Sequence, residues 1–171
     1  MSRYRIVPDG SRVWIDARSN VHPIHSSTDG LEGFVELELD GDGRVRPDSA
    51  TGGKLSLAVA RLSSGNRMED RELQKRIDGR RFPTIEGVLD TIDGAGADGS
   101  VRVTGELTFR GVARRYTDAM TIRNVDDRTI RLDGSARFDI RDFGMQPPHV
   151  LMLKVEPEVD VRVEILAARE E

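Results

Sequence analysis

The chain contains no cysteine. This absence and the others described below exclude several classes of protein. Without a thiol there is no disulfide, no cysteine nucleophile and no cysteine-bound metal. No run of about 18 apolar residues occurs, so no transmembrane helix is expected. The formal net charge of −4, with arginines scattered among acids, argues against non-specific binding to nucleic acid.

Large aromatic side chains are also scarce, with five Phe, two Tyr and one Trp in 171 residues. The N-terminal segment has no apolar stretch of signal-peptide length, so we expect a cytoplasmic protein. No linker, repeat or low-complexity segment divides the chain. Its length suits one domain with a substantial core, and we expect residues 1–171 to form that domain.

Apolar and polar residues alternate with a period of two along much of the chain. From Leu151 to Ile165 every odd position is apolar, and from Lys154 to Glu164 every even position is charged. This pattern predicts a β-strand with one dry face and one wet face. The strand is longer than the usual length of about 5–6 residues, so it has to bend, and Pro157 is the expected bend.

Shorter alternating segments separated by turns fill most of the remaining chain. The predicted strands are Arg3–Pro8, Arg12–Arg18, Leu31–Asp40, Lys54–Leu62, Thr84–Asp93, Ser100–Arg110, Tyr116–Arg123 and Thr129–Arg141. A helical rhythm appears only at about 66–78, where Asn66 is the expected N-cap and Gly79 the expected C-terminal stop. Ser19–Asp29 is expected to be an irregular polar loop.

This pattern predicts an all-β fold, and the long strands favour an extended, closed antiparallel barrel of eight strands with one short helix. The predicted inward face includes several small residues, such as Gly33, Gly87, Gly105 and Gly134. An eight-stranded barrel is wide enough either to be filled by side chains or to hold one small ligand. Few bulky side chains favour a ligand cavity, but glycines also permit strand coiling and bulges, so both interpretations remain open on pattern alone.

Three segments of the sequence resemble the motifs of a known protein family. Leu62–Pro83 reads LSSGNRMEDRELQKRIDGRRFP, Gly105–Val112 reads GELTFRGV and Phe138–Met145 reads FDIRDFGM. Together with the last strand, they are similar to the YceI-like family of lipid-binding proteins, also called polyisoprenoid-binding proteins, from about Tyr4 to Ile165. The resemblance implies a lipocalin-like barrel, commonly a homodimer, whose apolar pore holds an isoprenoid or another long amphiphile. Many members are periplasmic or secreted, unlike the expectation for this chain.

We therefore expect a non-catalytic protein that transports or stores a long-chain lipid, such as a polyisoprenoid, with no cofactor, no metal, no nucleic-acid partner and no stable membrane insertion. The residues expected to line the lumen are Ile15, Val35, Leu37, Leu57, Val59, Leu89, Val103, Leu107, Phe109, Met120, Ile122, Leu132, Gly134, Phe138, Val159 and Val161. The residues expected near a ligand head group at the mouth are His22, His25 and Arg67.

Two other functions stay open. His22 and His25, with an acid such as Asp29, are candidate ligands of a metal-dependent enzyme, although Pro23 and the loop setting make their spacing unspecific. A fully packed barrel without a ligand would instead suit a dimeric stress or interaction protein.

A group of charged residues carries a further structural expectation. Arg67, Asp70 and Arg71 on the helix are expected to form a salt-bridge network with Arg141 and Asp142, pinning the helix to the barrel.

Overall fold

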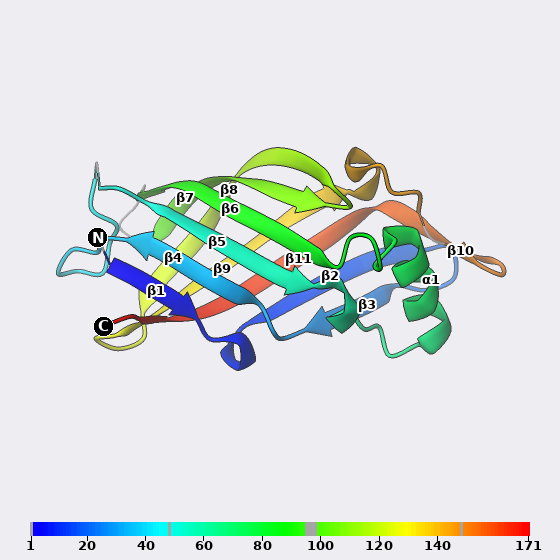
Figure 1. Cartoon of the computed structure of the whole chain (residues 1–171), viewed down its shortest axis with the longest axis horizontal. Coiled ribbons are helices and arrows are strands. Elements are labelled where there is room, and N and C mark those ends of the chain that lie inside the picture. The colour runs from blue at the N-terminus through cyan, green and yellow to red at the C-terminus, as the bar shows by residue number, and fades with distance from the viewer. Residues whose placement is uncertain (1, 48, 95–98, 148) are drawn as a thin grey trace.

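The computed structural model describes residues 2–47, 49–94, 99–147 and 149–171 and forms an elongated β-barrel (Figure 1). A helix crosses one end, and both chain termini lie at the other. The elements are β1 (Ser2–Ile6), η1 (Pro8–Gly10), β2 (Arg12–Ser19), β3 (Ile24–Thr28), β4 (Glu32–Leu37), β5 (Gly52–Ala58), η2 (Val59–Arg61), α1 (Arg67–Ile77), β6 (Thr84–Gly94), β7 (Ser100–Phe109), β8 (Val112–Asn124), β9 (Thr129–Asp139), η3 (Ile140–Phe143), β10 (His149–Val150) and β11 (Leu153–Arg169).

The barrel closes because one long strand meets both ends of the sheet. β11 pairs with β9 along one edge, and along its other edge it pairs first with β2 and then with β1. β1 and β2 thus occupy one position in the wall, interrupted by η1, and β3 and β4 occupy the next. With β5, β6, β7, β8, β9 and β11, the circuit has eight antiparallel positions. This confirms the expected eight-stranded lipocalin-like barrel.

The bend in β11 lies where the sequence places it. The strand has 17 residues, and its register with β2 shifts between the pairs Val155↔Ser19 and Val159↔Ala17. Pro157 lies inside this interval, and a proline cannot donate a backbone hydrogen bond to a ladder. The shift lets one strand follow the curved wall over the length of the barrel.

Several predicted boundaries are wrong. Residues 24–28, expected to be loop, form β3, because a hairpin turn pairs them with β2 from Ala17↔Ile24 to Val13↔Thr28. β5 ends at Ala58, and Val59 lies in the 3-10 turn η2. β8 begins at Val112, four residues before the predicted start, because it pairs with β7 up to Phe109↔Val112.

Helix α1 begins as predicted. The Asn66 side chain accepts hydrogen bonds from the backbone N–H groups of Met68 and Glu69, at 3.0 and 3.1 Å. At the other end it is Asp78, rather than the expected Gly79, that adopts the left-handed conformation, with φ 61°. Aspartate tolerates this region better than most residues because its short polar side chain bonds locally.

Replacing Asn66 with alanine should therefore destabilise the protein by about 1 kcal/mol, since it leaves two N–H groups of the first turn without their acceptor. Asn66→Asp is the matched control, because a carboxylate oxygen accepts the same bonds. Urea unfolding measures both. An alanine variant as stable as the aspartate variant would contradict the assigned cap.

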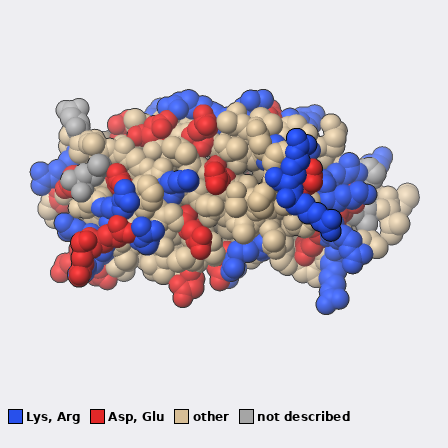
Figure 2. All heavy atoms as spheres, viewed as in Figure 1, with Lys and Arg blue, Asp and Glu red and all other residues tan. Residues whose placement is uncertain are grey.

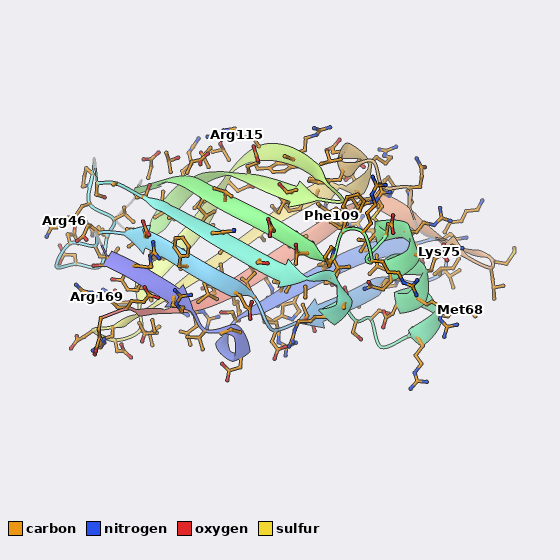
Figure 3. All side chains as sticks on the ribbon, in the orientation of Figure 1. Arg46, Met68, Lys75, Phe109, Arg115 and Arg169 are labelled. Carbon is orange, nitrogen blue, oxygen red and sulfur yellow. The ribbon has the colours of Figure 1, made fainter. Side chains whose placement is uncertain are left out.

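The barrel interior divides into two halves. In the half that holds the termini, large side chains from opposite walls fill the space; they include Val35, Leu37, Ile92, Ile130 and Leu132, all almost fully buried. In the half covered by α1, many inward side chains are only partly buried, although they face the interior. Figure 3 shows Phe109 in this half, close to the helix. Within the described residues, no helix has the length and hydropathy needed to cross a membrane.

Candidate functional site: an apolar cavity under helix α1

A cavity of about 380 Å³ occupies the α1 half of the barrel. Its wall comes from β2, β3, β5, β6, β7, β8, β9 and β11, and its cover includes Leu73 and Ile77 of α1. Phe143 and Met145, at and just after η3, add two buried side chains at the same end. Apart from a few polar residues, aliphatic and aromatic side chains line the cavity, so it favours an apolar occupant.

The structure brings part of the predicted lumen to this cavity. The predicted residues that line it are Ile15, Leu57, Leu107, Phe109, Met120, Gly134, Phe138, Val159 and Val161. Those that do not are Val35, Leu37, Val59, Leu89, Val103, Ile122 and Leu132. Most of the second set lie in the packed half, while Val59 lies in η2, where its carbonyl accepts a hydrogen bond from Gln74 of α1. Alternation predicts the face of a strand, but it does not predict the depth along the barrel at which that face meets open space.

Some lining residues were missed at the sequence level. Ile24 and Ser26 of β3 line the cavity, but their strand was expected to be loop. Leu73 and Ile77 of α1 also line it; they are four residues apart and so share one side of the helix, and this apolar spacing is the signal in the sequence that could have found them. Asp118 of β8 also lines the cavity. Asp118 lies two residues from Met120, so both point to the same face of β8, but an apolar pattern alone does not include an aspartate.

The expected mouth residues lie outside the cavity. His25 is exposed, and its Nδ1 lies 2.6 Å from Oδ1 of Asp16. His22 is also exposed, with Nδ1 2.9 Å from the Pro23 carbonyl oxygen and Nε2 3.6 Å from Oε1 of Glu69. Arg67 points to solvent at the start of α1. None of the three is among the residues that line the cavity.

The suggested metal ligands are not brought together. Asp29 pairs with Arg61 at 2.6 Å, and the hydrogen bond from this guanidinium holds the pKa of Asp29 below its usual value. Across the part of the chain that the structure describes, no group of three or more His, Asp or Glu side chains is placed to hold a metal ion. The metal-dependent alternative therefore has no donor set to build on in these residues.

The predicted salt-bridge network between helix and barrel is wrong. Asp70 instead accepts hydrogen bonds from the backbone N–H and the hydroxyl of Ser64, at 2.8 and 2.6 Å, in the loop before α1. Arg141 pairs with Asp139 two residues earlier, at the start of η3. The charges close short local turns, and apolar contacts of Leu73 and Ile77 hold the helix on the barrel.

The cavity wall is incomplete between β8 and β9. Each strand pairs with its other neighbour along most of its length, but they pair with each other only over residues 120–124 and 130–134. Beside the unpaired part, the lining includes consecutive residues, 118–120 and 134–136, whereas on the other strands it follows every second residue. Because consecutive side chains point to opposite faces, this lining shows that the cavity extends into the gap between the strands.

An aromatic contact spans this gap instead of backbone hydrogen bonds. The rings of Tyr116 on β8 and Phe138 on β9 lie edge to face, with centroids 5.0 Å apart. Phe143 lies beside them, 6.3 Å from Tyr116. Burial, and to a lesser degree the nearby Asp142 carboxylate, raises the pKa of Tyr116 above its ordinary value. The phenol is therefore neutral at physiological pH, and its ring packs against Phe138, which lines the cavity.

Sequence comparison identifies the protein family. The family profile described as a YceI-like domain matches residues 4–167, nearly the whole chain. The chain belongs to the YceI-like family. None of the curated proteins compared with it matches in sequence.

Several solved structures share the fold. Burkholderia cenocepacia BcnA is 19% identical, with a TM-score of 0.77 over 94% of this chain and 98% of that one. A polyisoprenoid binding domain from Saccharophagus degradans, implicated in plant cell wall breakdown, is 11% identical, with a TM-score of 0.76 over 98% of each chain. The Campylobacter jejuni YceI protein is 14% identical, with a TM-score of 0.66 over 85% of each chain.

Proposed function

We propose that this YceI-like protein binds one long-chain apolar lipid, such as a polyisoprenoid, in the cavity under α1, and that it transports or stores this lipid without catalysis. The observation that carries the proposal is the cavity of about 380 Å³ with its aliphatic and aromatic lining. A volume of roughly 300–1,000 Å³ is typical of small-molecule sites. The polyisoprenoid binding domain of Saccharophagus degradans, which shares the fold, supports this choice of ligand class.

The energetics of burial suit such a ligand. Each CH₂ group removed from water contributes about 0.8 kcal/mol. Ten buried groups therefore contribute about 8 kcal/mol, which corresponds to roughly micromolar affinity before the entropy of association is subtracted. A hydrocarbon chain can thus bind with few hydrogen bonds, and the few polar groups of the lining are enough to orient its polar end.

Lipid extraction from natively purified protein tests the proposal. Mass spectrometry of the extract should show about one long-chain lipid per chain, and the stripped protein should take up added geranylgeraniol. A protein that carries no lipid and does not bind geranylgeraniol would overturn the proposal and favour the ligand-free interaction protein. The cytoplasmic location and the homodimer stay predictions, which cell fractionation and analytical ultracentrifugation measure.

A further inference from the structure

Exposed apolar side chains gather at the α1 end of the barrel. Among the described residues, six large hydrophobic side chains are exposed, and four of them lie on the segments at this end: Val21, Met68, Leu151 and Met152. Leu151 and Met152 are the most exposed of the six, at 86% and 82%. Large apolar side chains in a group on the surface are typical of a binding surface, whereas single ones are common.

Specific contacts hold together the segments that carry these side chains. The side chain of Asn20, next to Val21 in the β2–β3 turn, donates to the Met152 carbonyl at 2.9 Å and accepts from the Lys154 N–H at 2.6 Å. The same turn reaches the start of α1 through the pair of His22 and Glu69. Three segments distant in sequence thus present one surface, which we call the α1-end surface: Val21, Met68, Leu151 and Met152, with the helix cations described next.

The outer side of α1 adds a row of positive charge. Arg67, Arg71 and Lys75 follow one another at intervals of four residues, so they lie on one side of the helix, and all three are exposed. Figure 2 shows blue side chains gathered at this end, and Figure 3 shows Lys75 and Met68 there, opposite Arg46 and Arg169.

The acids of the same helix have other partners. Glu69 faces His22, Glu72 pairs with Arg76 at 2.8 Å, and Asp70 binds the Ser64 turn. Within the described residues, no acid forms an ion pair with the row of Arg67, Arg71 and Lys75. The α1-end surface therefore combines exposed apolar side chains with cations that are available to an external anion, in a chain whose net charge is −4.

We propose that the α1-end surface docks reversibly on an anionic lipid bilayer. Apolar side chains that enter the interface and cations that meet anionic head groups are the two attractions that hold peripheral proteins on such membranes. Charge complementarity favours this partner over a second copy of the chain, because two identical α1-end surfaces would bring their cations against each other.

Docking at this place would bring the cavity close to its lipid source. The same helix presents Arg67, Arg71 and Lys75 to the outside and Leu73 and Ile77 to the cavity. A membrane bound at the α1 end thus lies one helix away from the apolar space. The inference goes beyond lipid binding inside the barrel, and it can fail or hold independently of that proposal.

Vesicle co-sedimentation tests the charge contribution. Wild-type protein should bind phosphatidylcholine vesicles that contain phosphatidylglycerol and bind pure phosphatidylcholine vesicles much more weakly. The variant R67E/R71E/K75E should lose about a hundredfold in affinity for the anionic vesicles, since each cation near such a surface contributes roughly fivefold. The matched control is R46E/R123E/R169E, which reverses three exposed charges at the opposite end of the barrel and should bind like wild type.

A second variant tests the apolar contribution. M68S/L151S/M152S should bind the anionic vesicles at least about tenfold more weakly, because its exposed apolar area at the interface is lost. V125S, which changes an exposed valine at the other end, is its control and should have no effect. All variants should keep the lipid that co-purifies with wild type, because none of their positions lines the cavity.

Three results would overturn the docking proposal. The first is equal binding of wild-type protein to the two kinds of vesicle, and the second is an equal loss of vesicle affinity in the α1-end variants and their controls. The third is a wild-type dimer that M68S/L151S/M152S converts to a monomer. Wild-type protein that docks on anionic vesicles but holds no lipid would leave docking in place and contradict only the proposed cavity ligand.

Discussion

Gly87→Phe is expected to weaken lipid binding by roughly a hundredfold while leaving the barrel folded. Gly87 lines the cavity, and a Cβ placed there would meet only the side chain of Leu55, at 3.7 to 4.0 Å, which is ordinary van der Waals contact. The phenyl ring would therefore enter the cavity without forcing the wall apart. Displacing about four CH₂ groups of a bound chain would cost about 3 kcal/mol, or roughly a hundredfold in affinity. Fluorescence titration with a long-chain lipid probe measures the loss.

Gly52→Phe is the matched control for this variant. Gly52 is also a strand glycine whose added Cβ makes only an ordinary contact, 3.6 Å from the Leu89 carbonyl oxygen, but it does not line the cavity. It should bind the probe like wild type. Gly134→Phe is a less clean test, because its Cβ would lie 2.8 Å from the Cγ of Met120 and would push that side chain aside. Full binding by Gly87→Phe would contradict the assigned cavity.

Leu37→Ala is expected to destabilise the lipid-free protein by about 2–5 kcal/mol without changing lipid affinity. Leu37 is fully buried in the packed half of the barrel, so its removal leaves a void that its neighbours cannot fill. Leu107→Ala, in the cavity wall, should lower the stability clearly less than Leu37→Ala does. It should lower the lipid affinity more. Part of the Leu107 side chain faces space that is already open, so fewer packing contacts are lost.

Urea unfolding of both lipid-free variants, with lipid titration at native conditions, compares the two halves. The expected result is a reversal of order, with Leu37→Ala less stable and Leu107→Ala the weaker binder. If both substitutions cost the same stability and the same affinity, the interior is uniform, and the division into a packed half and an open half is wrong.

Most of the barrel can be predicted from the sequence, because antiparallel strands with one wet face have a strong signature. The alternation from Leu151 to Ile165 predicts the long strand that closes the barrel, and Pro157 predicts its change of register. Asn66 predicts the start of helix α1. These features depend on residues near each other in sequence, and local propensity acts directly on them.

β3 escapes prediction for a physical reason. Its inward positions hold Ile24, Ser26 and the buried Thr28, of which only the isoleucine is strongly apolar. One apolar residue among polar neighbours does not give an alternating pattern that would predict a strand. Pairing with β2 makes this segment a strand. The neighbouring strand determines the conformation of this segment, as is common for short β-strands.

The site was predicted only in part, because its depth is a property of the closed barrel. Leu132 and Phe138 lie on the same face of β9, but Leu132 meets side chains from the opposite wall and Phe138 meets the cavity. No local pattern separates the two. The gap between β8 and β9 is also invisible in the sequence. It depends on where two long strands diverge and not on any residue that breaks them.

The most direct test of the account is a crystal structure of the protein with a long alkyl chain that carries bromine at its end. Anomalous density for bromine should lie between α1 and the level of Gly134 and Met120, with none beyond Leu132. Bromine density in the half that holds the chain termini, or an α1 half filled by side chains with no ligand between them, would contradict the claim that this end of the barrel is built to hold a lipid.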